Sequence, residues 1–194
     1  MSVRSKLLAI LTIGPAYGFQ LHSEIQSRTA HRRAVNAGQI YSTLERAINQ
    51  GTVRSAGLTD DGLPLYALTD RGRGEAMAWL TSTTSAAGDE WDDMIDRVLL
   101  SSSIPGGDPA PLIAAYRGFW GSVAGPAETG HGELSGQAQL AAAGAVSLSA
   151  AALDWLAQAE ALIASAGAAA FQRPLSSTRP KRGRRPTLAH FASA

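Results

Sequence analysis

The segment from Asn36 to Gly51 constrains the fold most, because it predicts a short helix with two chemically different faces. At 100° per residue, one face is apolar and consists of Ala37, Ile40, Leu44, Ala47 and Ile48. The opposite face is polar and consists of Gln39, Ser42, Thr43, Arg46 and Asn49, with Tyr41 and Glu45 between the two. Asn36 suits the N-cap, and Gly51 suits the position beyond the C-terminus because glycine tolerates positive φ. Such a polar face is either an ordinary solvated surface or one that bonds to bases and phosphates.

The flanking segments favour the nucleic-acid interpretation. Upstream, one helical pattern ends at Gly14-Pro15 and a second runs from about Gly18 to Ser27. Downstream, two short β-type runs, residues 52–55 and 65–68, enclose an Asp-Gly step that favours a hairpin turn. A further helix opens at Thr69-Asp70. Three helices followed by a two-stranded ribbon predict a winged helix-turn-helix, whose third helix enters the DNA major groove.

Three ordered motifs of the chain resemble those of PadR-type transcription factors (phenolic acid decarboxylase regulators). They are residues 7–11 with 14–21, residues 38–46, and residues 65–72. The resemblance covers residues 5–80 and implies a homodimer that joins through C-terminal helices and responds to a ligand. Two departures stand out: Ser42 replaces a common proline, and the wing tip, residues 59–64, carries two aspartates where the family's wing is rich in arginine. Carboxylates there would repel phosphates.

On this reading the polar helix face contacts bases or the adjoining backbone through Gln39, Ser42, Thr43, Arg46 and Asn49. Phosphate contacts are expected from Tyr41, Arg32, Arg33 and Arg54.

Composition argues against an enzyme. The chain has 194 residues and no cysteine, so disulfides and thiolate metal sites are excluded. Its four histidines are scattered, and there is no glycine-rich phosphate loop or nucleophile elbow, so we expect no catalytic residue, metal or cofactor. We also found no 18-residue apolar run and no signal-peptide core, which predicts a cytoplasmic protein without a membrane partner.

The net charge of +1 conceals a strong segregation along the chain. Residues 1–80 carry a net +3, residues 81–170 a net −8 and residues 171–194 a net +6. A basic head and a basic tail around an acidic middle suit a protein whose two ends lie on nucleic acid.

The predicted fold is mainly α with a small two-stranded β wing: an N-terminal winged helix-turn-helix followed by a C-terminal helical dimerisation domain. We expect a DNA-binding domain at 1–80, a linker at 81–88, a helical dimerisation and ligand-sensing domain at 89–170, and a disordered basic tail at 171–194. The helical stripes of the third segment carry more apolar surface than they can bury alone, which favours pairing with a second copy.

Most aromatic residues gather in that third segment. Trp91, Phe119, Trp120 and Trp155 are candidates for a site that binds a small aromatic or cationic effector, and Asp96 or Asp154 could supply a counter-charge. The alternative is that these rings are core or interface filler.

The basic tail contains an Arg-Gly-Arg-Arg-Pro core that resembles an AT-hook, a motif that lays arginines along a narrow minor groove. Its candidate DNA contacts are Arg179, Lys181, Arg182, Arg184 and Arg185.

Two functions fit these features. One is a homodimeric repressor that reads a pseudopalindromic operator and is released by an effector. The other is an architectural protein that coats double-stranded DNA with little sequence preference.

Overall fold

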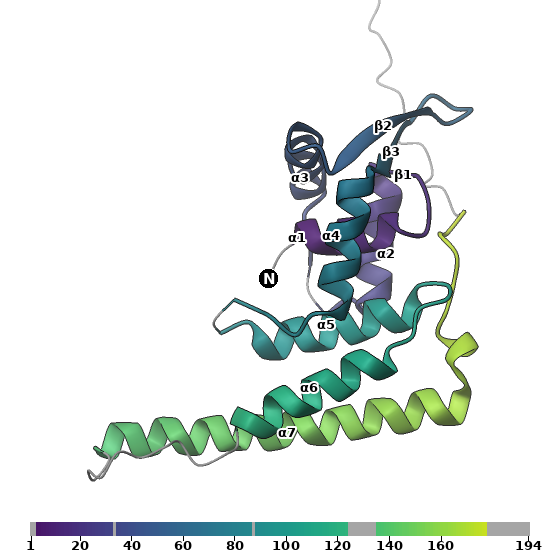
Figure 1. Cartoon of the computed structure of the whole chain (residues 1–194). Helices are drawn as coiled ribbons and strands as arrows, with labels where there is room; N and C mark the ends of the chain where they lie inside the picture. The colour runs from purple at the N-terminus through teal and green to yellow at the C-terminus, as the bar shows by residue number, and fades with distance from the viewer. Residues whose placement is uncertain (1–2, 33, 87, 124–134, 178–194) are drawn as a thin grey trace, which may run out of the picture.

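The computed structural model describes residues 3–32, 34–86, 88–123 and 135–177, which form a head above a layer of long helices (Figure 1). The head contains α1 (Val3–Leu11), β1 (Ala16–Tyr17), α2 (Gly18–Arg28), α3 (Ala37–Asn49), β2 (Val53–Leu58), β3 (Pro64–Leu68) and α4 (Asp70–Thr81). The layer contains α5 (Glu90–Ser103), α6 (Ala110–Val123), α7 (Gly136–Ala166) and the short 3-10 helix η1 (Ala168–Ala170). The predicted fold class, mainly helical with an N-terminal winged helix-turn-helix, is confirmed.

The sheet has one strand more than the sequence predicts. The wing hairpin of β2 and β3 is joined by β1, in the antiparallel order β1-β3-β2, with Ala16 opposite Tyr66 and Tyr17 opposite Leu65. The β2 strand carries an irregularity between Ser55 and Leu58. Because β1 immediately precedes α2, this pairing ties the helix-turn-helix directly to the base of the wing.

The core of the head is completed from outside the predicted DNA-binding domain. Apolar residues of α1, α2, α3 and α4 pack together with Leu100 of α5 and with Ile104, the C-cap of that helix. The other face of α5 supplies Met94, Ile95 and Val98 to a second core, shared with α6 and α7. The helix α5 therefore lies between the two cores and serves both.

A buried arginine fixes the segment that follows α4. Arg97 donates hydrogen bonds to the carbonyl oxygens of Ser82 and Thr84, and its guanidinium lies 4.9 Å from the ring centre of Trp79. The chain between α4 and α5 is thus held against α5 at these two residues.

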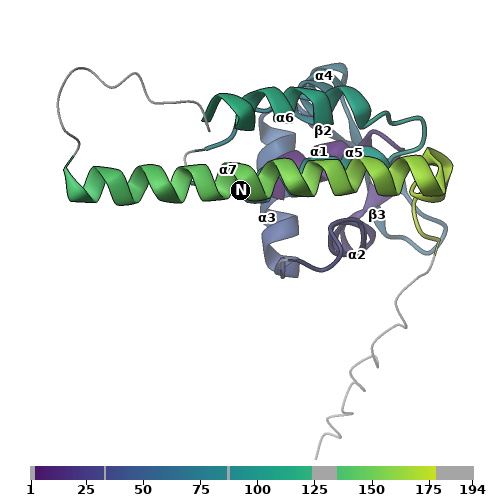
Figure 2. The same ribbon diagram turned by 90° about the horizontal axis from the view of Figure 1, so that it is seen from below.

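The longest helix, α7, is largely uncovered. It begins at Gly136, earlier than the apolar stripe from Leu148 indicates, because Ser135 caps it by accepting a hydrogen bond from the amide of Ala138. At 1.5 Å per residue it is about 47 Å long, and it extends beyond the head on one side (Figure 2). Only Ser149, Ala152 and Leu156 of this helix are buried.

The composition of α7 corrects the expectation that no apolar run is long enough to cross a membrane. The helix passes that test by length and hydropathy alone, because residues 138–153 are mostly alanine, leucine and valine and include no charged residue.

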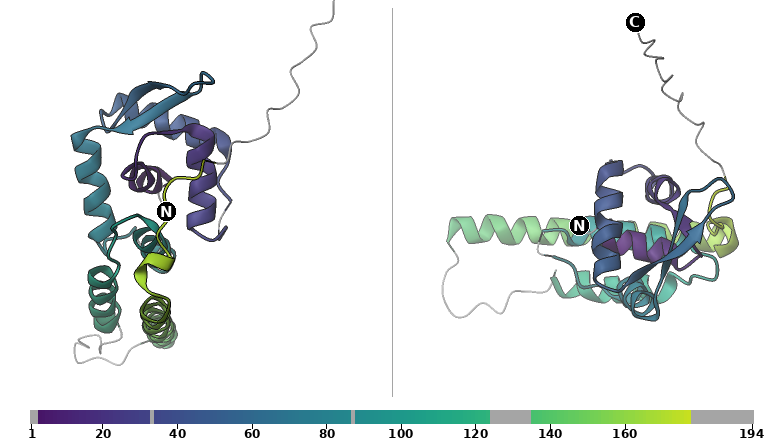
Figure 3. Two further views of the ribbon diagram at one scale, coloured as in Figure 1. Left: turned by 90° about the vertical axis from the view of Figure 1, so that its right-hand side faces the viewer. Right: turned by 90° about the horizontal axis from the view of Figure 1, so that it is seen from above.

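The start of the predicted tail also differs from the expectation. The disordered tail was expected from residue 171, whereas residues 171–177 run upward from the end of α7 along the head (Figure 3). Hydrogen bonds to α2 and to the end of α5 hold this segment, as described below.

Candidate nucleic-acid interface

The helix α3 lies on the upper side of the head, beside the wing (Figure 1). Both predicted caps are confirmed: the side-chain oxygen of Asn36 accepts a 2.8 Å hydrogen bond from the amide of Gly38, and Gly51 has a φ of 71°. Asn36 therefore satisfies one of the amides that a helix N-terminus leaves unpaired.

The buried face of α3 is rotated slightly from the predicted one. It consists of Ile40, Thr43, Leu44 and Ala47, the i, i+3, i+4, i+7 set that lies on one side of a helix. Ile48, predicted to be buried, lies at the edge of this set and is 40% exposed. Thr43, predicted to contact DNA, is only 4% exposed, because it lies between Ile40 and Ala47. This corrects its assignment as a base-contacting residue.

The exposed face of α3 carries the other predicted base contacts. Gln39, Ser42, Arg46 and Asn49 are all exposed to solvent. The guanidinium of Arg46 lies back along the helix, where it donates to the carbonyl oxygen of Ser42 at 3.1 Å and to the hydroxyl of Thr43 at 3.3 Å. Thr43 thus has a part in orienting Arg46, although it does not itself reach the surface.

Tyr41 lies at the corner where α2, α3 and the wing meet. Its ring lies so close to Gly18 that a Cβ there would be 2.4 Å from the ring carbon Cε1, so glycine is required for this approach. Burial raises the pKa of Tyr66 on β3, and the nearby phenol of Tyr41 raises it further. Tyr41 is nevertheless 49% exposed, so part of its side chain faces solvent beside the polar face of α3.

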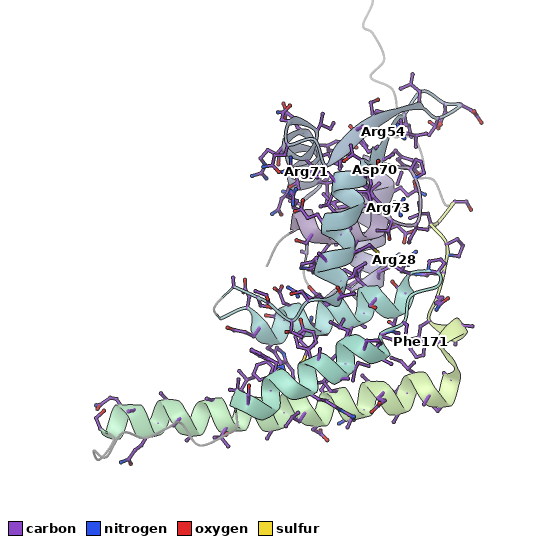
Figure 4. All side chains as sticks on the ribbon, viewed as in Figure 1. Arg28, Arg54, Asp70, Arg71, Arg73 and Phe171 are labelled. Atoms are coloured by element: carbon purple, nitrogen blue, oxygen red, sulfur yellow. The ribbon has the colours of Figure 1, made fainter. Side chains whose placement is uncertain are left out.

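One of the two wing-tip carboxylates is engaged within the turn. The carboxylate of Asp61 accepts a 2.6 Å hydrogen bond from the hydroxyl of Thr59, within the turn, whereas Asp60 is exposed. Leu58 is 67% exposed beside them. Arg54, near the start of β2, is exposed (Figure 4).

One predicted phosphate contact is engaged elsewhere. Arg32 donates to Asp92 at 2.8 Å and to Asp96 at 2.9 Å, both on α5, and Asp96 also pairs with Lys6. These ion pairs direct Arg32 toward the helical layer, so the assignment to DNA is corrected. The same pairs remove Asp96 as a counter-charge for an effector.

Several predicted contacts lie outside the described residues. They are Arg33 of the head and, in the tail, Arg179, Lys181, Arg182, Arg184 and Arg185.

A further arginine beside α3 escaped the sequence analysis. Arg71 is exposed in the first turn of α4, and it donates a 3.1 Å hydrogen bond to the carbonyl oxygen of Gln50, at the end of α3 (Figure 4). A cation in this position is stabilised by the negative end of the helix dipole. The sequence feature that could have identified Arg71 is its position in the 65–72 motif, next to the predicted start of the helix at Thr69-Asp70.

The four candidate effector residues do not share one site. Trp120 is buried and donates from its indole nitrogen to the sulfur of Met94 at 3.0 Å, while Phe119 packs edge-on against it. Trp91 is half-buried against the same core. Because Trp120 has its polar atom satisfied within the core, its role is structural.

Trp155 lines a hollow of about 180 Å³ between α5 and the end of α7, whose wall includes none of the other three. The wall is mainly apolar and includes Leu99, Leu162 and Phe171, with Ser102 and Gln158 as its polar groups. Binding pockets for small molecules usually measure at least about 300 Å³. One protomer therefore offers room for a single small aromatic ring, or half of a larger site. No cluster of metal-ligating side chains occurs in the described ranges.

The sequence of the head matches a known family. Residues 7–78 match the transcriptional regulator PadR-like family. The matched segment includes α2, α3, the whole wing and most of α4. A comparison with curated protein sequences gave no match.

Solved structures of PadR proteins resemble the chain more distantly. Bacillus subtilis PadR in complex with operator DNA is 16% identical, with 80% of this chain and 96% of that chain covered and a TM-score of 0.38. The same protein in complex with p-coumaric acid is 16% identical, with 84% and 98% covered and a TM-score of 0.37. The PadR-like regulator BC1756 from Bacillus cereus is 15% identical, with 84% and 99% covered and a TM-score of 0.37. At such TM-scores these likenesses carry no inference about the site.

Proposed function

The chain belongs to the PadR-like family of transcriptional regulators through residues 7–78, and from this premise we propose that it is a homodimeric, sequence-specific transcriptional repressor. The observation that carries the proposal is the exposed face of α3. A helix capped at both ends and packed by its apolar side presents a mainly polar face to the exterior, beside a wing.

In the proposed complex, α3 enters the major groove and reads base edges through Gln39, Ser42, Arg46 and Asn49. These amide, hydroxyl and guanidinium groups are those that discriminate base pairs there. Phosphate contacts come from Tyr41, Arg54 and Arg71, and from basic residues of the tail. We retain residues 1–80 as the DNA-binding domain on this basis.

The second part of the proposal is the dimer, formed through residues 89–170. The exposed apolar side chains of α7 include Leu140, Val146, Leu148 and Leu162. The other side of α7 already packs against α6. An exposed apolar surface on the remaining side indicates a protein partner. A second copy, related by a two-fold axis, is the usual solution. Asp154 and Glu160 are exposed on the same helix, which favours a protein partner over lipid and a cytoplasmic location.

We assign the effector to the hollow beside Trp155. Its rings and aliphatic side chains suit a small aromatic compound, cationic or phenolic, and the end of a paired α7 would enlarge the site. Because α5 lies in both cores, a ligand that shifts α5 changes the support of the head as well as the dimer.

Footprinting of the purified protein on the DNA upstream of its own gene tests the proposal. One short protected palindrome, with half-sites about one helical turn apart, is the result expected of the repressor. Diffuse coverage that spreads with protein concentration would instead support the architectural coating protein.

A further inference from the structure

The segment that leads from α7 to the basic tail is bonded to the body of the protein at nearly every residue. We call residues 172–176 the strap. At its lower end the side-chain amide of Gln172 makes two 3.0 Å hydrogen bonds to the backbone of Gly106 and Gly107. The amide of Arg173 then donates to the carbonyl oxygen of Ser103 at 3.1 Å.

An ion pair on α2 is hydrogen-bonded to the middle of the strap. Arg28 pairs with Glu24 at 2.6 Å, and both side chains are almost completely buried. One nitrogen of the Arg28 guanidinium donates to the carbonyl oxygens of Arg173 and Pro174, each at 2.9 Å. Burial lowers the pKa of Arg28. The guanidinium remains charged in this range, since arginine is effectively never deprotonated in proteins.

The upper end of the strap is fixed by α2 as well. The carboxylate of Glu24 accepts a 2.6 Å hydrogen bond from the amide of Ser176, and the side chain of Gln20 donates to the carbonyl oxygen of Ser176 at 2.7 Å. Leu175 packs against the core of the head between these bonds. The Glu24–Arg28 pair therefore satisfies the strap's carbonyl oxygens with one partner and its amide with the other.

The strap changes the place from which the tail starts. The helix α7 ends in the lower layer, on the side of the molecule away from α3, whereas the strap rises along α2 to the level of β1 (Figures 1 and 3). Its last anchored residue, Ser176, is bonded to Gln20, and β1, which pairs with the wing, ends at Tyr17. The tail thus leaves the body near the base of the wing.

We propose that the Glu24–Arg28 pair and the strap form an anchor that delivers the basic tail to the DNA beside the wing. The inference rests on the proposed DNA-binding function. Residues 178–194 carry five basic residues and no acidic one, and an extended chain covers about 3.4 Å per residue. From Ser177 the run from Arg179 to Arg185 can therefore reach about 27 Å, whereas a chain that started at η1 would use its first residues to climb the head.

The anchor also offsets a weakness of the wing. The exposed Asp60 and Leu58 give the wing tip little attraction for phosphate. Arginines that start at the base of the wing restore positive charge there and can enter the adjacent minor groove.

A tethered cleavage reagent tests the inference. The chain lacks cysteine, so Ser177→Cys gives a single attachment point for an iron chelate that generates hydroxyl radicals. On footprinted DNA we expect cleavage confined to one patch outside each half-site, on the wing side. Ser176→Pro removes the amide that bonds to Glu24, and cleavage in that patch should fall about tenfold and spread, as expected for the loss of a hydrogen bond to a charged group. Ser176→Ala keeps the amide and should cleave like the parent.

A double variant tests the ion pair itself. Glu24→Gln with Arg28→Met removes both charges together, which leaves no buried charge unpaired, and should spread the cleavage further. Unchanged cleavage in both Ser176→Pro and the double variant would overturn the inference.

Hydrogen exchange without DNA separates this inference from the proposed function. We expect slow exchange at the amides of Arg173 and Ser176 in the parent and faster exchange in Ser176→Pro at Arg173. Exchange at the rate of an unstructured peptide in the parent would overturn the anchor. A protected strap in a protein that binds no DNA would overturn the proposed function, and with it the delivery of the tail, while the anchor itself would stand.

Discussion

The helices α3 and α7 both expose most of one side, but the two exposed surfaces are chemically opposite. On α3 the rest of the head covers the apolar face and leaves glutamine, serine, arginine and asparagine outside. On α7 only three residues are buried, and leucine, valine and alanine side chains are left outside.

The two helices differ in how many of the contacts that they need are supplied within one protomer. The helix α3 has its caps, its core contacts and its orientation within one protomer, so it is ready to bind a polar partner. The helix α7 has its caps but lacks cover for its apolar surface, which is why we propose that another molecule completes its environment. The two surfaces therefore point to different partners: nucleic acid for α3 and a second protein chain for α7.

The largest effect is expected when α7 is made polar. Leu148 and Leu162 are two heptads apart and share one face, and both are exposed in the single chain. If they are buried in a dimer, changing both to Glu costs about 4 kcal/mol over the two copies, or about 1,000-fold in dimer dissociation. Sedimentation equilibrium measures this, with Gln137→Glu at the start of α7 as a control for added negative charge on the same helix. An unchanged dimer, or a monomeric parent, would contradict the assignment of α7.

A smaller effect is expected where α3 is supported from below. Gly72 of α4 lies against the backbone of Thr52, which follows the C-terminal end of α3. A Cβ on Gly72 would be 1.9 Å from the carbonyl oxygen of Thr52. Gly72→Ala should therefore lower the free energy of unfolding by about 1–3 kcal/mol, because backbone must move. Gly74→Ala, in the same helix with open space around it, should raise that free energy by about 0.5–1 kcal/mol. Urea unfolding compares the two, and equal effects would show that this junction is not closely packed.

The smallest effect is expected from an exposed ion pair between α1 and α4. The hydrogen bond from Arg4 lowers the pKa of Glu75 below its ordinary value of 4.5. Glu75 therefore stabilises the fold above that pH, and the contribution is lost as the pH falls through the folded-state value. At about pH 7 the melting temperature of the parent should be slightly higher than that of Glu75→Gln, and at about pH 3 the two should be equal. Glu45→Gln serves as the control. A difference that persists in acid would show that the carboxylate acts by something other than its charge.

Local signals were sufficient to predict α3. Asn36, Gly51 and the spacing of Ile40, Leu44 and Ala47 act within one helix, so they are visible in the sequence. The burial of Thr43 and the exposure of Ile48 were not predictable, because they depend on where the other helices of the head meet α3. The two-residue strand β1 is likewise too short to give a pattern.

Contacts between distant segments account for the remaining differences. Arg32 is drawn from the DNA surface by carboxylates on α5, about sixty residues further along the chain. The strap has a polar composition that is typical of disorder, and it is held mainly through its backbone carbonyl and amide groups, which every sequence carries. Trp155 lines a hollow that depends on contacts between α5, α7 and Phe171, and its role in binding an effector stays a prediction.

The most direct test of the central claim, that α3 reads base sequence, compares Arg46→Ala with Arg54→Ala. Affinities for the footprinted operator and for unrelated DNA should be measured for both at several salt concentrations. We predict that Arg46→Ala lowers the ratio of operator to unrelated-DNA affinity by about 1–3 kcal/mol, or about 5- to 150-fold, whereas Arg54→Ala weakens both DNAs alike and lowers the salt slope by about one. A uniform loss with Arg46→Ala, and an unchanged ratio, would contradict the claim.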